Sequence, residues 1–266
     1  MKIYISADIE GVAGIAAWEE ARSSSASFPY FARQMTMEVA AACKGASNAG
    51  ADEVWVKDAH GRGRNMDPSM LPENIRLIRG WSGHPYKMLH GIDETFHAIG
   101  FVGYHSHGGS NTNPLAHTIS STTIDHMKLN GEYMSEFLLH AYLASYLEIP
   151  IAFLSGDKGI CEEAKKFNKN IVTVAVNEGV GASSISMHPN RAIRLIEKEM
   201  GNALRRDLSQ NHVELPEHFK LEVAYNDHTG AYRYSFYPGA RQNSPNSIVF
   251  ETDDYYEIMR ATSFLV

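Results

Sequence analysis

The chain has 266 residues, of which 44% are hydrophobic and 21% are charged, proportions typical of a globular protein with one large or two modest domains. Its net charge of −7 gives it no general attraction to nucleic acid or to anionic lipid. No apolar run is long enough to span a bilayer, and acidic residues interrupt the apolar stretch at the start, so we expect neither a membrane segment nor a signal peptide. The two cysteines, Cys43 and Cys161, form neither a disulfide framework nor a thiolate zinc site, and we expect a cytoplasmic location.

The first residues form a short, β-branched run that predicts a buried strand ending in a glycine turn. Ile3 and Ile5 alternate with polar residues, and Asp8 and Glu10 come where the strand ends. A spacing of two points both carboxylates to the same side of the sheet. Two like charges this close repel unless a proton or a cation lies between them, and carboxylate oxygens suit zinc, manganese and magnesium. For this pair taken alone, the alternative is a solvated turn with two ordinary acids.

Strand and helix patterns then alternate along the chain, which favours a mostly parallel central sheet flanked by helices. A polar, Ser-rich segment at 18–27 is expected to form a loop over the site. Strands are predicted at 53–58, 75–78, 96–103, 149–154 and 171–176. Helices are predicted at 31–48, 86–89, 134–146, 162–167 and 189–208.

After residue 210 the pattern changes to a smaller α+β layer. Alternating strands are predicted at 219–225, 231–237 and 247–251, followed by a helix at 253–264. The segment 116–124 also alternates like an exposed strand, and Asn130-Gly131 predicts a hairpin turn. We therefore expect a catalytic α/β domain at 1–210 and a smaller α+β domain at 211–266, with the segment at about 108–130 as a candidate addition to the second domain.

Polar side chains recur where the predicted parallel strands end. These strand ends share one edge of the sheet, where ligands bind in open α/β folds. The side chains at this edge, with a nearby helical glutamate, are Asp8, Glu10, Asp58, His60, His105 and Glu136. Carboxylates and imidazoles in this number suit two metal ions about 3.5–4 Å apart, which together activate a water and polarise a carbonyl. Asp8, with two oxygens, is the best candidate for a bridge, and the chemistry indicated is metal-assisted hydrolysis of an amide, ester or phosphoester.

Several neighbouring residues have open roles. Asp58 is a candidate to fix the tautomer of His60 rather than to bind metal. Asp157 ends a strand, where it either lines the site or caps the next helix. His107 is a rival to His105, which is preferred because it lies nearer the strand. His90 and His97 are expected to be structural or surface residues.

The hexapeptide Ser6-Ala-Asp-Ile-Glu-Gly11 resembles the Ser-x-Asp-x-Glu-Gly signature of the D-aminopeptidase family of dinuclear zinc peptidases, family M55. The similarity continues through Asp58-Ala-His60, Gly103-Tyr-His105, Ala116-His117, Ser135-Glu136 and Gly156-Asp157. The resemblance implies two zinc ions per subunit, held by Asp8, Glu10, His60, His105 and Glu136. It also implies that His117 is the catalytic histidine, on the far side of the substrate from the metals, and that the protein is a homo-decamer of two stacked pentamers.

The expected function is therefore that of a metal-dependent aminopeptidase, which removes N-terminal D-amino acids from short peptides or amides through a dinuclear zinc site. One alternative keeps the metals and changes the substrate, giving another amidase, a deacylase or a phosphoesterase. The other alternative is a small-molecule or peptide binding protein with a single structural metal.

Overall fold

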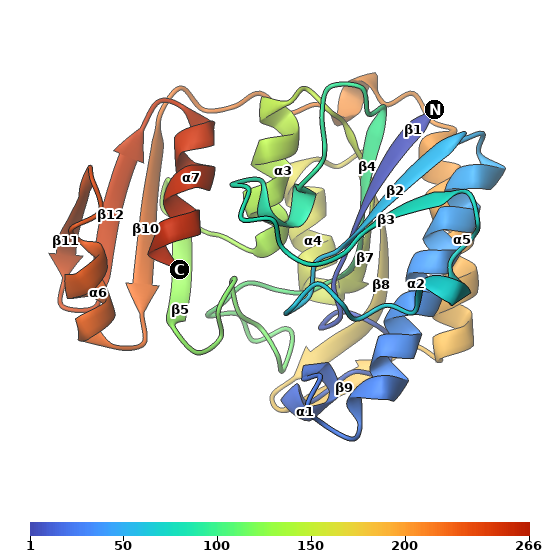
Figure 1. Cartoon of the computed structure of the whole chain (residues 1–266), viewed down its shortest axis with the longest axis horizontal. Helices are drawn as coiled ribbons and strands as arrows, with labels where there is room; N and C mark the ends of the chain where they lie inside the picture. The colour runs from blue at the N-terminus through green and yellow to red at the C-terminus, as the bar shows by residue number, and fades with distance from the viewer.

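Two β-sheets, with the helix α3 (Glu136–Tyr146) between them, organise the computed structural model, which describes residues 1–266 (Figure 1). The larger sheet has the order β3-β2-β1-β4-β7-β8-β9, and all its pairs are parallel except β8 with β9. Its strands are β1 (Lys2–Ala7), β2 (Glu53–Asp58), β3 (Ile75–Ile78), β4 (Ala98–Tyr104), β7 (Ile151–Asp157), β8 (Val172–Val180) and β9 (Ser183–Ser186). The predicted mostly parallel α/β class is confirmed.

Helices cover both faces of this sheet, because its central strands are apolar on both sides. On one face α2 (Phe28–Asn48) packs against α5 (Pro189–Leu204), and Ile3 and Ile5 of β1 belong to the apolar cluster there. On the other face lie α3 and α4 (Lys158–Phe167), where Tyr4 joins a second cluster. Neither these helices nor any other is long and apolar enough to cross a membrane.

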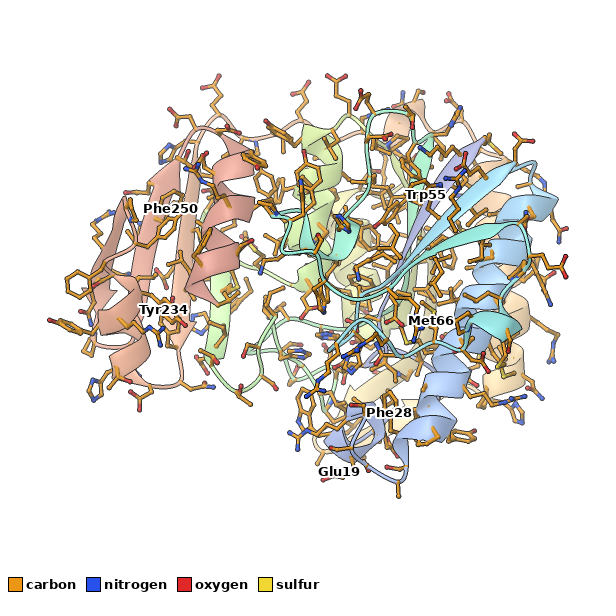
Figure 2. The ribbon with its side chains drawn as sticks, viewed as in Figure 1. Glu19, Phe28, Trp55, Met66, Tyr234 and Phe250 are labelled. Carbon is orange, nitrogen blue, oxygen red and sulfur yellow. The ribbon has the colours of Figure 1, made fainter.

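The smaller sheet is antiparallel, with the order β11-β12-β10-β5-β6. Its strands are β5 (Ile124–Leu129), β6 (Glu132–Tyr133), β10 (Phe219–Tyr225), β11 (Ala240–Ser244) and β12 (Ser247–Thr252). Two helices accompany it, α6 (His228–Tyr234) and α7 (Tyr255–Leu265). Figure 2 places Tyr234 and Phe250 at this end of the molecule, opposite Trp55 and Met66 of the larger layer.

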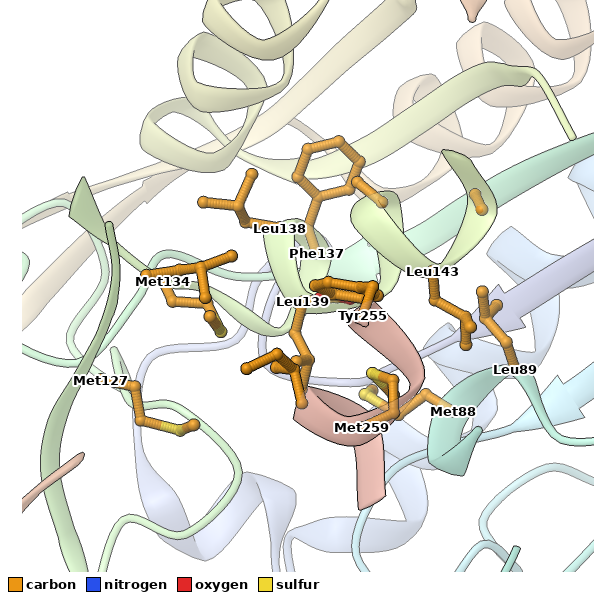
Figure 3. Packing of buried hydrophobic residues seen from close by; sticks show 14 of the residues in the cluster. Met88, Leu89, Met127, Met134, Phe137, Leu138, Leu139, Leu143, Tyr255 and Met259 are labelled. Atoms are coloured by element: carbon orange, nitrogen blue, oxygen red, sulfur yellow. The ribbon is translucent and has the colours of Figure 1, made fainter. Parts of the chain in front are cut away.

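A continuous apolar cluster joins the two layers. In Figure 3, Leu139 of α3 lies beside Tyr255 and Met259 of α7, with Met88 close by. Tyr255 also donates a hydrogen bond to the carbonyl of Leu139 over 2.6 Å. β5 pairs with β6 across the predicted Asn130-Gly131 hairpin turn and with β10 on its other side. The division into domains at residue 210, with the segment at about 108–130 as a candidate addition to the second domain, stays a prediction.

Two predicted strands are wrong. The segment 116–123 is irregular, and the strand begins only at Ile124. Ile119 has φ +65°, which breaks an extended chain, and its N–H donates to Glu136 Oε1 over 2.7 Å. The predicted strand at 231–237 is instead mostly helix α6, which Asp227 caps by accepting a hydrogen bond from Thr229 N.

Short elements complete the fold. The expected loop at 18–27 contains a one-turn helix, α1 (Trp18–Ala21), and the predicted helical piece at 86–89 is the 3₁₀ turn η2 (Lys87–Leu89). The sequence patterns missed β9 and β11, which are edge strands with mostly exposed side chains and therefore lack an apolar alternation.

Candidate metal centre

The predicted site residues meet at the carboxyl edge of the larger sheet. Beyond β1 the chain still pairs with β4, because Asp8 N donates to Val102 O over 2.8 Å and Gly11 N donates to Gly103 O over 2.9 Å. A Cβ at position 11 would lie 1.8 Å from the Tyr104 carbonyl oxygen, so only glycine allows the backbone this approach. The close contact holds the turn between Asp8 and Gly11, including Glu10, against the end of β4.

Asp8, Glu10 and His60 form the first group. His60 Nδ1 lies 3.3 Å from Asp8 Oδ1 and 3.0 Å from Glu10 Oε2. The other ring nitrogen, Nε2, lies 2.7 Å from the carbonyl oxygen of Ala21. A carbonyl only accepts hydrogen bonds, so Nε2 carries a hydrogen and Nδ1 is the nitrogen that faces the two carboxylates. Burial would lower the pKa of His60, but Glu10 and Asp8 raise it well above its usual value.

His105, His117 and Glu136 form the second group. Glu136 opens α3, whose N-cap Ser135 accepts a hydrogen bond from Leu138 N. Glu136 Oε1 lies 3.8 Å from His105 Nε2 and 3.5 Å from His117 Nε2. The outer nitrogens of the two rings again face carbonyls, Ser106 O at 3.0 Å and Leu115 O at 2.9 Å.

Asp8 connects the two groups. One of its oxygens faces His60, and the other lies 3.5 Å from His105 Nε2. The structure thus places between the two groups the carboxylate that the sequence predicts as the bridge. That Asp8 binds metal stays a prediction.

The electrostatics of the site favour bound positive charge. Burial and the Glu10 carboxylate raise the pKa of Asp8 to about 8. Burial would lower the pKa of His105, but Glu136, Glu10 and Asp8 raise it to about 9. Glu10 Oε2 and His105 Nε2 are both buried and lack a hydrogen-bond partner. Protons or cations can satisfy these atoms, and the mixture of carboxylates and imidazoles fits zinc.

Asp58 and His107, whose roles the sequence leaves open, both make contacts outside the cluster. Asp58 accepts hydrogen bonds from Asn65 N, Asn65 Nδ2 and Met66 N, so the suggestion that it orients the His60 ring is wrong. Its partner Asn65 instead donates to the His60 carbonyl over 2.7 Å and thereby holds the turn that carries His60. His107 stacks on Tyr133 with ring centroids 4.9 Å apart, outside the cluster.

Asp157 is fully buried and caps α4 by accepting a hydrogen bond from Ile160 N over 2.9 Å. It also accepts from the backbone and hydroxyl of Ser106 and from Asn113 Nδ2. It does not line the cavity described below, so of the two suggested roles the structure supports the cap. Its additional bonds anchor the segment that follows His105.

His90 and His97 are the two histidines expected to be structural or surface residues. His97 accepts a hydrogen bond from Lys2 N, which is a structural role.

The carboxylates open into a cavity of about 590 Å³. His117 reaches this cavity, whereas His105 does not line it. Trp18 of α1 forms part of the wall, and its ring packs edge-on against His117 with centroids 5.2 Å apart. The segment 18–27, which the sequence predicts to lie over the site, does line the cavity through Trp18 and Arg22. Sequence reasoning missed Lys87, because a lysine in a turn carries no motif.

The comparisons with known proteins agree with this geometry. The profile of the D-aminopeptidase family matches residues 1–264. The chain is 27% identical over 263 residues to a D-aminopeptidase of Bacillus subtilis (strain 168), a match that covers 98% of this chain and 95% of that protein. A solved structure, the Zn-dependent D-aminopeptidase DppA from Bacillus subtilis, which is a self-compartmentalizing protease, superposes with a TM-score of 0.93 at 25% identity, covering 100% of this chain and 96% of that one.

Proposed function

Because the chain belongs to the D-aminopeptidase family of peptidases, we propose that it removes an N-terminal D-amino acid from short peptides or aminoacyl amides with the help of two zinc ions. The observation that carries this proposal is the shared orientation of three imidazoles. His60, His105 and His117 each turn one ring nitrogen toward a backbone carbonyl and the other toward a carboxylate. A metal-binding histidine is commonly held in place by a hydrogen bond from its other ring nitrogen to a backbone carbonyl.

We assign the metal ligands to the three buried carboxylates and to the two histidines that each face two of them. Asp8, Glu10 and Glu136 are buried, His60 faces Asp8 and Glu10, and His105 faces Asp8 and Glu136. A pair of zinc ions held there would lower the pKa of water and polarise the scissile carbonyl. The zinc dependence of the Bacillus subtilis neighbour supports the choice of metal.

His117 is assigned as the catalytic histidine because it lines the cavity and faces only one carboxylate, Glu136, whereas His60 and His105 each face two. With Nδ1 fixed by the Leu115 carbonyl, Nε2 is the atom that can accept or return a proton at the substrate or hydrogen-bond the developing oxyanion. Trp18 limits the rotation of this ring and covers it from solvent. A free substrate amine would bind at the site through a carboxylate or a metal ion, which would favour a substrate that presents its N-terminus there.

We further propose that the protein acts as a homo-oligomer, a decamer of two stacked pentamers. The support is the self-compartmentalizing neighbour, since a protease can enclose its own active sites by assembling into rings. Light scattering coupled to size exclusion gives the subunit number directly. A monomer at micromolar concentration would contradict this part of the proposal, and a cytoplasmic location stays a prediction from the sequence.

The deciding experiment measures turnover of D-Ala and L-Ala p-nitroanilides before chelation, after chelation and after zinc add-back, beside a metal count. The expected result is zinc-restored activity, about two metals per chain, and a preference for the D substrate. If the protein binds two metals but cleaves only aryl phosphates or acyl amides, the result would favour a phosphoesterase, or another amidase or deacylase. One tight ion without any turnover would favour a binding protein.

A further inference from the structure

The cavity has a cationic side that the proposed chemistry does not use. Three basic side chains, Arg22, Arg62 and Lys87, line it, and none of them makes an ion pair or donates a side-chain hydrogen bond within the chain. The nearby Lys57 behaves differently, because its ammonium group donates to the carbonyls of Asp58 and Gly80. Arg22 lies over the Trp18 ring, 5.7 Å from its centroid, so Arg62 and Lys87 are the lining cations without a contact of this kind.

Lys87 is the innermost of the three. Arg22 and Arg62 are exposed at the rim, whereas Lys87 is half-buried. It lies close enough to Glu136 for that carboxylate to act on its pKa, which burial lowers to about 8. A half-buried ammonium group that makes no hydrogen bond or ion pair is costly, so its retention favours an anionic ligand.

The backbone holds Lys87 in a fixed and strained position. Its φ is +45°, a left-handed conformation that lysine rarely adopts and that occurs preferentially at functional sites. The next residue is held on both sides, because Met88 N donates to His140 Nε2 over 3.3 Å and Met88 O accepts from the Ser6 hydroxyl over 2.8 Å. The backbone next to Lys87 is thus anchored to α3 and β1.

The cavity consequently offers two kinds of group to a substrate, the proposed metal centre and the ammonium group of Lys87. A dipeptide can use both, since its scissile bond would lie at the metal centre and its carboxylate lies one residue beyond that bond. We propose that Lys87 binds the terminal carboxylate of the substrate, so that the enzyme selects dipeptides with a free carboxyl end over amides and longer neutral chains. The proposal rests on the proposed function and names the substrate class of that site.

The test compares D-alanylglycine with D-alanylglycinamide, which differ only in the carboxylate. The zinc-loaded wild type should cleave the acid about 10- to 100-fold better in kcat/KM, the range expected for one hydrogen bond to a charged group. Lys87→Met should remove this preference by raising KM for the acid, leave the amide within about twofold, and keep the metal count. Lys87→Arg should retain the preference, and Lys44→Met, which removes an exposed charge from α2, should behave as wild type.

An equal loss on both substrates would overturn the proposal, because Lys87 would then act on the scissile carbonyl or on the fold. A wild type without preference for the acid would also overturn it. Calorimetric titration of the same two compounds separates this inference from the proposed function. If neither compound is cleaved, tighter binding of D-alanylglycine that is lost in Lys87→Met still supports the carboxylate site. Equal binding of the acid and the amide would contradict it.

Discussion

The rings of His105 and His117 stack in parallel, with centroids 4.3 Å apart and planes inclined by 8°. Both inner nitrogens face the same Glu136 oxygen, at 3.8 and 3.5 Å. Only His117 lines the cavity, while His105 is 1% exposed and also faces Asp8. Two rings in contact therefore differ in access to substrate, and this difference underlies the separate roles proposed for them.

Replacement of His117 tests its role. His117→Gln should lower kcat by about 10²- to 10⁴-fold, the usual contribution of a general acid or base, while two zinc ions remain bound. Kinetics on D-alanine p-nitroanilide and a metal count on the same sample measure both effects. His107→Gln is the matched control, because His107 stacks on Tyr133 away from the cavity and should keep full activity. Loss of one zinc ion from His117→Gln would instead identify His117 as a ligand.

The position of Asp8 between the two groups predicts unequal metal loss. Asp8→Asn should release both ions, because Asp8 faces His60 with one oxygen and His105 with the other. Glu136→Gln should weaken only the ion beside His105 and His117. The measurement is zinc per chain by elemental analysis after dialysis against a mild chelator. Two tightly retained ions in Asp8→Asn would contradict the bridging role.

The part of the candidate site that lies at the ends of parallel strands could be predicted from the sequence, because the geometry of such strands is regular. Asp8, Glu10, His60 and His105 follow parallel strands, and the ends of such strands share an edge. The hydrophobic patterns of the central strands were readable for the same reason, since burial on both faces leaves continuous apolar runs.

The remainder depends on tertiary contacts that no local pattern encodes. The segment 116–123 alternates like a strand, yet the bond from Ile119 N to Glu136 and the left-handed Ile119 backbone keep it irregular. His117 lies in this segment, and only the family resemblance singled it out. Lys87 likewise depends on the anchoring of Met88 by His140, which is distant in sequence.

Asp157 should be a major determinant of stability. Its buried carboxylate accepts four hydrogen bonds, from Ser106 N, Ser106 Oγ, Asn113 Nδ2 and Ile160 N. Asp157→Ala leaves these donors buried without an acceptor and should lower the free energy of unfolding by roughly 3–5 kcal/mol. Urea denaturation measures the change. Asp227→Ala removes a helix cap from an exposed position and should cost clearly less, and equal costs would contradict the importance of the buried network.

Glu38, which is not one of the proposed metal ligands, should make the stability of the protein depend on pH. It is buried on α2, where Oε1 accepts hydrogen bonds from Ala13 N and Gln34 Nε2 and Oε2 has no partner. Burial raises its pKa from the ordinary value of 4.5 to about 7. The folded protein thus keeps a proton that the unfolded chain releases above about pH 4.5. The stability contributed by the protonated form is complete below that pH and is lost as the pH rises through 7.

Glu38→Gln mimics the protonated carboxyl and removes this dependence, so its advantage over wild type should grow between pH 5 and pH 8. A shift of this size corresponds to about 3 kcal/mol at most, an upper bound because the buried carboxylate can gain water. Urea unfolding of metal-free protein at intervals across this range gives the difference, and using the difference cancels titration of the ligand cluster, which both proteins share. Glu162→Gln, which removes an exposed carboxylate from α4, should leave the slope unchanged. A gap between Glu38→Gln and wild type that stayed constant with pH would show that Glu38 is ionised in the folded protein throughout, with Ala13 N and Gln34 sufficient to hold its charge.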